Sequence, residues 1–541
     1  AADLQAEGAQ GVVTNAQYDT WWHGGFRTAP YYHNSVGILS EAASARLMTP
    51  VEIKPEQLAR TSTRGLPSAL QPATNFPDPW PGGAWRPRDI MEMELIASRS
   101  VLSLAAKYRE RYLRNFYRLG RRALDWRAGD GRAVAYLIPP GQGRDEAVAR
   151  MVSLLVEQGV EVHRLERELH GFVTEPLHQY SAAGDRRTTN SHGGHGDART
   201  PSEQELPAGS YVVMLVQPYR ANVQALFERQ VYPDRRTGTG EAERPYDVAG
   251  WTLPMQMGVE TTAVLGFREP ERERRLTPIR DEAQVRRDLG LAPRQGERSP
   301  VASPLRQNVR VGLYKSYTAS MDEGWTRYVF DTFNVPFQSV FDRDVHAGNL
   351  RSRFDVIVLP SMRLRDLVEG RDDDTAPPEF TRGLGAAGTE ALRRFVEEGG
   401  TLVCIDAATE FAIKRLNLPV RNALADLKSS EFYCPGSILR LEVDTSHPLA
   451  RGFGESADAY FVNSAAFDVT DRDRARFVAR YAARDVLRSG WLLGEKHLAG
   501  KAALVEVSLG RGRVVLFGFR PQHRAQTWGT FPFLFNALEW Q

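Results

Sequence analysis

The sequence predicts a protein of the α/β class with more than one domain, and three observations lead to this prediction. Apolar runs typical of buried strands alternate with helix-like stretches between residues 129 and 267, and the alternation begins again after residue 307. A chain of 541 residues exceeds what one hydrophobic core usually supports. Residues 64–88, rich in proline and glycine, and the charged residues 268–306 separate the predicted folding units.

The composition is that of an ordinary globular protein and argues against several function classes. Hydrophobic residues make up 42% of the chain and charged residues 25%, and the net charge of +2 is too small to attract nucleic acid. No stretch approaches the roughly 20 apolar residues that cross a bilayer. Cys404 and Cys434 are the only cysteines, too few for a disulfide framework or a cysteine-rich metal site. We therefore expect no nucleic-acid partner and no membrane span.

The first 63 residues are predicted to be the end of a domain. A short strand is expected over residues 11–14, followed by an aromatic and glycine-rich loop. Residues 35–41 then predict a buried strand that ends in an acid, Glu41. The prolines and glycines of residues 64–88 predict a long loop or linker without regular structure.

A helical connector is expected next, up to about residue 128. No proline interrupts residues 89–126, and apolar or small side chains recur there at helical spacing, which predicts one long helix or two consecutive helices. The positions that carry this spacing are Met93, Ile96, Ser100, Leu104 and Tyr108.

The middle domain, residues 129–267, shows an α/β pattern. A strand, a helix and a second strand follow one another closely, and such a βαβ unit predicts a parallel sheet. The expected elements are strands over 133–140, 160–163 and 210–216 and helices over 145–158 and 221–229. Residues 181–206 contain almost nothing apolar and predict a solvated, mobile loop.

The last domain, residues 307–541, alternates strands and helices in the manner of a doubly wound sheet. The expected elements are strands over 309–314, 354–360 and 400–405 and helices over 322–333 and 388–398. We expect this region to form a complete cooperative domain.

The aromatic and glycine-rich residues 18–28 and the following residues 31–41 resemble the last part of the catalytic domain in large bacterial zinc carboxypeptidases of the carboxypeptidase A family. Further segments are similar to the accessory regions of the same multidomain proteins, so that the resemblance covers nearly the whole chain. These segments are residues 207–212, 217–219, 244–254 and 530–538.

The resemblance implies roles for individual residues. Glu41 matches the strand-end acid that, in the family, takes a proton from a zinc-bound water, so it is the expected catalytic residue. Tyr18 matches a tyrosine that closes over the substrate, although Tyr31 and Tyr32 compete for this assignment. Arg27 could bind the terminal carboxylate of a peptide substrate with two hydrogen bonds.

The chain departs from the family pattern at the zinc ligands. The family holds zinc with a His-x-x-Glu pair and a later histidine upstream of the Glu-bearing strand, and residues 1–40 contain no such pair. His23 and His33 are more simply explained as loop residues. His192 and His195 lie in a glycine-rich stretch and are only a weak metal signal. We expect zinc in the full-length parent protein, and neither zinc nor another metal bound by this chain alone.

The last domain is similar to the class I glutamine amidotransferase-like fold, where a strand leads into a tight turn that bears a nucleophilic cysteine. The expected nucleophile position holds Ala407 or Ala408, and no glycine is present to permit a strained turn. Cys404 falls within the strand, where a thiol is usually inert. We therefore expect a catalytically silent domain. An active hydrolase centred on Cys404 would need a histidine such as His447 or His523 beside it.

Together these features give a functional expectation. The parent protein is expected to be a secreted or periplasmic zinc metallocarboxypeptidase that hydrolyses C-terminal residues of peptides, and this chain alone is expected to be inactive. The alternative is a non-catalytic module that binds a peptide or glycan. Since a buried apolar strand needs paired neighbours, residues 35–41 should expose an apolar edge when their partner strands are missing.

Overall fold

The computed structural model divides the chain into two compact units, Ala1–Asp125 and Trp126–Gln541, which are described separately. It describes residues 1–540 with the exception of 17–24, 26, 45–48, 60–67, 128, 130–131, 174–201, 239, 246–247, 269–271, 295–300, 307, 318–319, 372–376 and 378–379. Both units combine helices with sheets, which confirms the α/β class.

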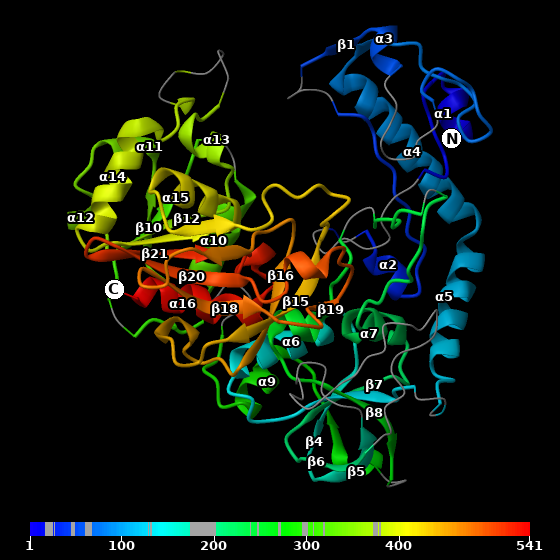
Figure 1. The fold of residues 1–541 in the computed structure, drawn as a ribbon. Helices are drawn as coiled ribbons and strands as arrows, with labels where there is room; N and C mark the ends of the chain where they lie inside the picture. The colour runs from blue at the N-terminus through cyan, green and yellow to red at the C-terminus, as the bar shows by residue number, and fades with distance from the viewer. Residues whose placement is uncertain are drawn as a thin grey trace. The chain divides into compact units, whose positions relative to one another are not determined.

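The first unit is dominated by two consecutive helices, α4 (Pro87–Lys107) and α5 (Arg109–Ala123), as expected for residues 89–126. The two helices are separated at Tyr108, whose backbone angles are not helical. Figure 1 shows α5 continuing from α4. The unit also contains short elements: α1 (Ala2–Ala6), α2 (Ala29–Tyr32), α3 (Pro55–Leu58) and the antiparallel strands β1 (Val51–Ile53) and β2 (Gly83–Trp85).

Two strands expected near the N-terminus are not formed, so these predictions are wrong. Residues 11–14 run beside residues 75–78 with two backbone hydrogen bonds but make no ladder. Residues 35–41 have no regular secondary structure and no paired neighbour among the described residues. Val36 and Ile38 are 62% and 64% exposed. Without a partner strand the apolar pattern cannot satisfy its backbone groups or bury its side chains.

The N-terminal part of the second unit contains a sheet of seven strands in the order β6-β5-β8-β3-β7-β4-β9. Every neighbouring pair in it is antiparallel. Its strands are β3 (Ala135–Ile138), β4 (Val162–Leu165), β5 (Leu169–Val173), β6 (Ser202–Leu206), β7 (Tyr211–Met214), β8 (Thr262–Phe267) and β9 (Leu276–Pro278). The helices that accompany them are α6 (Asp145–Glu157), α7 (Arg220–Phe227), α8 (Leu253–Met257) and α9 (Glu282–Asp288).

The prediction of a parallel sheet in this region is wrong, although the expected strand-helix-strand unit of β3, α6 and β4 is present. The strand β7 lies between β3 and β4 and is antiparallel to both, so the two strands of the unit never pair. This is a split βαβ arrangement. Strand order is set by long-range pairing, which local patterns do not report.

Three segments expected to be irregular contain regular structure. The loop expected over residues 64–88 includes β2 and the first residues of α4, so the expectation of no regular structure there is wrong. Of the loop expected over residues 181–206, residues 181–201 lie outside the described residues, but residues 202–206 form β6 and pair with β5. The expected linker at residues 268–306 contains β9, which extends the sheet beside β4, and α9. Arg286 of α9 is buried and donates two hydrogen bonds to Glu146 of α6, at 2.8 and 2.9 Å. These bonds hold α9 against α6. The expected domain limits themselves remain a prediction.

The C-terminal part of the second unit contains a larger sheet of twelve strands. Its parallel half has the order β11-β10-β12-β13-β21, the 2-1-3-4-5 order of a doubly wound sheet, as expected. These strands are β10 (Val311–Tyr314), β11 (Phe337–Val340), β12 (Val356–Leu359), β13 (Thr401–Ile405) and β21 (Gly512–Phe517).

Helices cover both faces of the parallel half. Alternate side chains of β12 enter two separate cores, Val356 and Val358 on one face and Ile357 and Leu359 on the other. The first core includes side chains of α10 (Met321–Thr332) and α16 (Phe531–Glu539); the second includes those of α11 (Asp342–His346), α12 (Leu350–Arg353), α13 (Leu364–Val368), α14 (Gly385–Glu397) and α15 (Thr409–Arg415). Figure 1 shows α12 and α14 on one side of these strands and α16 on the other.

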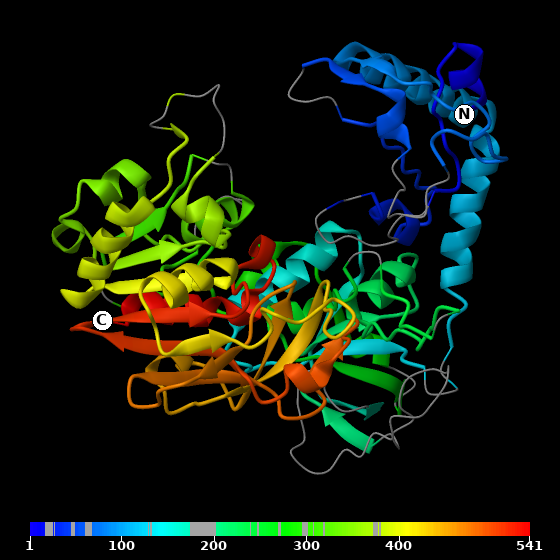
Figure 2. The same cartoon turned by 45° about the horizontal axis from the view of Figure 1, so that its top comes forward.

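An antiparallel half continues the same sheet beyond β21. Figure 2 shows its orange strands, residues 437–509, beside the parallel strands. They include β15 (Ser437–Val443), β16 (Ser456–Phe461), β17 (Phe467–Val469), β18 (Ala475–Tyr481), β19 (Leu487–Ser489) and β20 (Ala502–Leu509), and β14 (Val420–Asn422) pairs with β17. Hydrogen bonds such as that between the Thr252 and Ser489 hydroxyls, 2.8 Å apart, join this sheet to the middle region. Of the helices that the structure describes, none has the length and hydropathy of a bilayer-crossing segment.

Candidate functional site

Polar side chains from four parallel strands meet at the carboxyl edge of the larger sheet. Asp406 directly follows β13, Ser361 lies two residues after β12, Arg520 follows β21, and Asp322 lies in the first turn of the helix after β10. The carboxyl ends of parallel strands lie at one edge of a doubly wound sheet, which is where such folds place their ligands. We refer to these four residues as the edge cluster.

Asp406 occupies a strained turn between β13 and the following helix. Its φ of 51° lies in the left-handed region, and the residue is only 3% exposed. Aspartate is one of the few residues other than glycine that adopts this conformation readily. The hydroxyl of Thr409 donates to the Asp406 carbonyl at 2.6 Å and closes the turn. The tight turn therefore forms without glycine, and its strained position is Asp406 rather than the expected Ala407 or Ala408.

A single guanidinium neutralises part of the charge in the edge cluster. Arg520 Nε lies 2.9 Å from Asp322 Oδ1, and Arg520 Nη2 lies 2.9 Å from Asp406 Oδ2. The hydroxyl of Ser361 donates to the same oxygen of Asp406 at 2.8 Å and accepts from the Ala407 amide at 3.3 Å. The side chains of both aspartates are largely buried. Two carboxylates thus share one cation in a largely closed network.

Asp322 binds a proton more tightly than an ordinary aspartate does. Burial raises the pKa of Asp322 from its ordinary value of 3.8 to about 6; the charge of Arg520 opposes the rise and that of Asp406 adds to it. Burial also raises the pKa of Tyr481, and the charge of Asp406 adds to that rise. Asp322 can therefore hold or release a proton near neutral pH, a property typical of functional sites.

An aromatic group lies in the loop that follows Arg520. His523 is buried, stacks on Tyr460 with ring centroids 4.7 Å apart and meets the edge of Trp325 at 5.1 Å. The guanidinium of Arg524 lies 5.3 Å from the Trp325 ring. Arg524 and Ala525 both have positive φ, which gives the loop its sharp bend. The loop thus packs firmly on α10, the helix that carries Asp322.

The thiols do not provide a nucleophile at this edge. Cys404 lies within β13, is fully buried, and burial raises the pKa of its thiol, as expected of an inert residue. Cys434 is also buried, and burial raises its pKa too. The two histidines considered as bases have other contacts: His447 Nε2 lies 2.8 Å from Glu506, and His523 stacks on Tyr460.

The residues assigned from the carboxypeptidase resemblance lie in the first unit. Tyr18 and His23 fall outside the described residues. Arg27 is half-buried and Glu41 is exposed in chain that belongs to no strand. His33 Nδ1 lies 2.7 Å from the Ala29 carbonyl oxygen, a contact typical of a loop histidine. The structure leaves the assigned roles of Tyr18, Arg27 and Glu41 as predictions.

The described residues do not fit a zinc site. In the described ranges, no group of three or more histidine, cysteine or carboxylate side chains is arranged to hold a metal ion. His192 and His195 fall outside those ranges. Glu41 and His33 carry groups that can bind zinc, but a zinc site needs three or four such groups together.

The edge cluster was not predicted from the sequence, although a signal for it was present. Asp406 comes directly after a predicted buried strand and Ser361 directly follows another. The rule that ligands bind at the carboxyl ends of parallel strands could have singled out both. Arg520 carried no such signal, because β21 was not among the expected strands.

Comparisons with known proteins give weak structural likenesses. No family model and no curated protein matches the chain. Among solved structures, the chain is similar to the cytoplasmic protein STM3548 from Salmonella typhimurium, with 15% identity over 43% of this chain and 98% of that one and a TM-score of 0.28. The cytoplasmic protein STM1381 from Salmonella typhimurium LT2 gives 13% identity, coverages of 42% and 97%, and a TM-score of 0.28. A putative ThuA-like protein from Bacteroides uniformis gives 11% identity over 43% of this chain and 100% of that one, with a TM-score of 0.25. Scores this low carry no argument about function, which must come from the side chains.

Proposed function

We propose that this chain is part of a secreted or periplasmic zinc metallocarboxypeptidase and is inactive alone, and that its second unit binds a ligand rather than cleaving one. The peptidase assignment is supported by the motif resemblance over residues 18–28 and 31–41. The binding role is supported by the edge cluster of the second unit. The two parts of the proposal depend on different units and can be tested separately.

The observation that argues for a non-catalytic second unit is the set of contacts that Asp406 makes. A nucleophile at a strained turn must present an accessible lone pair, with a base or a lowered pKa to activate it. Asp406 is buried, and its Oδ2 already contacts both Arg520 and the hydroxyl of Ser361. The nearby thiol of Cys404 is buried within the strand. Asp406, next to the expected nucleophile position at Ala407 or Ala408, therefore holds the sheet edge together.

The peptidase role assigns Glu41 as the proton acceptor and Tyr18 and Arg27 as substrate-binding residues in the complete enzyme. Glu41 is exposed, and residues 36–41 pair with no strand among the described residues, so this segment is available to pair with strands supplied by the rest of a catalytic domain. The described residues of this chain offer no metal site, so no hydrolytic step is assigned to them.

The test compares this chain with a longer gene product that includes an upstream His-x-x-Glu segment. We expect the chain alone to release no C-terminal residue from peptides and the longer protein to do so. Glu41→Gln should abolish that activity, whereas Glu52→Gln, at an exposed position of β1, should preserve it. Chelator-sensitive hydrolysis by the present chain, or full activity in the Glu41→Gln protein, would contradict the peptidase assignment. Asp406→Asn should change neither the inactivity of this chain nor the activity of the longer protein.

A further inference from the structure

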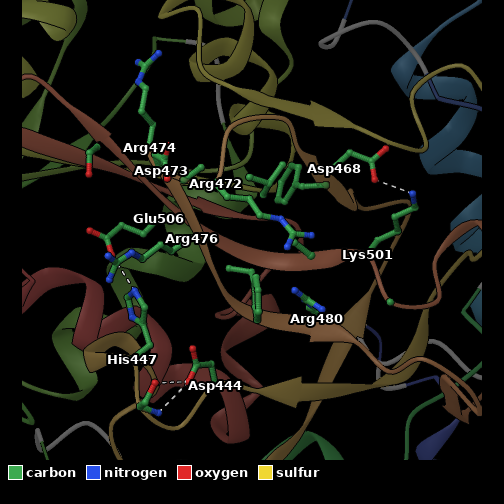
Figure 3. A pocket seen from close by; sticks show the side chains of 18 of the residues that line it. Asp444, His447, Asp468, Arg472, Asp473, Arg474, Arg476, Arg480, Lys501 and Glu506 are labelled. Atoms are coloured by element: carbon green, nitrogen blue, oxygen red, sulfur yellow. Dashed lines mark hydrogen bonds and ion pairs between the residues drawn. The ribbon is translucent and has the colours of Figure 1, made fainter.

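A hollow of about 880 Å³ lies on the antiparallel half of the larger sheet, away from the edge cluster. Its walls come from β17, β18 and β20, from the turn at residues 444–448 and from Trp540 near the C-terminus. Its size is within the range of pockets that take small ligands or short peptide segments. Figure 3 shows the charged side chains that line it.

Two of the four carboxylates that line the hollow, Asp468 and Glu506, pair with cationic side chains, whereas Asp444 accepts a hydrogen bond from Ser446 and Asp473 is exposed. Asp468 pairs with Lys501 at 2.7 Å and with Arg421, also at 2.7 Å. Glu506 lies 2.8 Å from His447 and 3.4 Å from Arg513. Both carboxylates have a lowered pKa, opposed by burial, because of these cationic partners. Both carboxylates therefore stay ionised, and their charge is balanced by these partners rather than by the other arginines of the hollow.

Several arginines of the hollow have no such partner. Within the part of the chain that the structure describes, no carboxylate pairs with the guanidinium groups of Arg472, Arg474, Arg476 or Arg480. In Figure 3 the ends of Arg472 and Arg480 lie toward the centre of the view, whereas Arg474 extends away from it. Guanidinium groups gathered without counterions make a locally positive surface in a protein with almost no net charge.

The surroundings of these arginines favour a fixed arrangement. The guanidinium of Arg480 lies over the Phe477 ring, 3.4 Å from its centroid, which restricts the side chain. Arg476 stands opposite Glu506 in the register of β18 and β20, so strand pairing fixes where its exposed side chain leaves the sheet. A planar guanidinium held in place binds a carboxylate with two parallel hydrogen bonds and loses little conformational entropy in doing so.

We propose that this hollow binds an acidic peptide segment that carries at least two carboxylate groups. The preference for carboxylates rests on Arg472, Arg476 and Arg480 in the hollow. The choice of a peptide rests on the proposed function, since peptides are the substrates of the predicted metallocarboxypeptidase. Bound acidic segments would keep a substrate chain close to the complete enzyme. The exposed carboxylate of Asp473, in the same wall, opposes an anionic ligand and limits its affinity.

The experiment measures binding of an acetylated and amidated hexaglutamate peptide by isothermal titration calorimetry at low ionic strength, with hexaglutamine as the uncharged control. Each charge-assisted contact contributes about tenfold in affinity, so Arg476→Ala should weaken binding about tenfold and Arg472→Ala with Arg480→Ala by more. Arg287→Ala, at an exposed position of α9, is the matched control and should leave affinity unchanged. Thermal unfolding of every variant verifies that it is folded.

Two further results distinguish the charge and the ligand class. Asp473→Asn removes a repelling charge and should tighten hexaglutamate binding about twofold to fivefold. Equal binding of hexaglutamine, loss of binding in Arg287→Ala to the same extent, or binding of oligogalacturonate but not hexaglutamate would overturn the proposal. The outcome does not depend on hydrolysis, so a failed peptidase assignment leaves it measurable.

Discussion

Replacing Asp322 by asparagine should stabilise the protein at neutral pH, although it removes a partner of Arg520. Asp322 is 8% exposed at the start of α10, and Arg520 Nε lies 2.9 Å from it. Burial raises its pKa to about 6, because desolvation outweighs the attraction of Arg520 and because Asp406 competes for the same cation. A buried ion pair whose desolvation exceeds its attraction can be replaced without loss of stability.

The magnitude follows from the difference between the folded and unfolded pKa values. The pKa of Asp322 is about 6 in the folded protein against an ordinary value of 3.8. Each tenfold change in proton affinity corresponds to about 1.4 kcal/mol, so ionised Asp322 destabilises the folded state by about 3 kcal/mol. Because the folded pKa is the raised one, the favourable contribution is complete below about pH 4 and is lost as pH rises through about 6. The asparagine variant has no such loss.

The assay is urea-dependent hydrogen exchange of residues 356–359 in β12, the central strand beside the edge cluster, at pH 4.5, 6.0 and 7.5. We expect Asp322→Asn to gain about 2 kcal/mol over the unmodified protein between pH 4.5 and pH 7.5, since part of the full difference is already lost at pH 4.5. Asp331→Asn, at an exposed position of the same helix, should show no such gain. A variant that becomes less stable than the unmodified protein as pH rises would refute the reasoning.

Three further predictions concern other parts of the second unit. Arg520→Leu leaves Asp406 buried without its cation and should cost about 3–5 kcal/mol at pH 7.5, measured by the same exchange of β12; an unchanged opening energy would speak against the edge cluster. Cys404 should react with Ellman's reagent only after urea unfolds the protein, since its thiol is fully buried; rapid reaction of the folded protein would contradict this. Arg286→Met should accelerate exchange in residues 282–288 with little effect on β12, since Arg286 anchors α9 locally, and equal acceleration in β12 would show a global effect instead.

The sequence alone determined those elements whose signal is local. The strands β10, β12 and β13 could be predicted because each is a short buried apolar run, and α10 and α14 because their apolar side chains recur at helical spacing, whereas the partly exposed β11 was not predicted. The helices α4 and α5 were readable because nothing interrupts residues 89–126. The inert state of Cys404 also followed from its place inside a predicted strand.

Only the tertiary structure decided how these elements pair. The insertion of β7 between β3 and β4 turned an expected parallel sheet into an antiparallel one, because hydrogen bonding between distant segments fixes strand order. Residues 35–41 have a strand pattern but form no strand, because a strand exists only through its neighbours.

The proximity of the four edge-cluster residues is the feature that the tertiary structure decided most completely. Asp322, Ser361, Asp406 and Arg520 span almost two hundred positions of the chain, and only the strand order of the sheet brings them together. The sequence could place Ser361 and Asp406 after predicted strands, but it gave no such signal for Arg520 and could not bring the four together. The left-handed turn at Asp406 and the raised pKa of Asp322 arise from that proximity and from burial. Both are properties of the assembled environment, because desolvation and charge sharing act between residues that are distant in sequence.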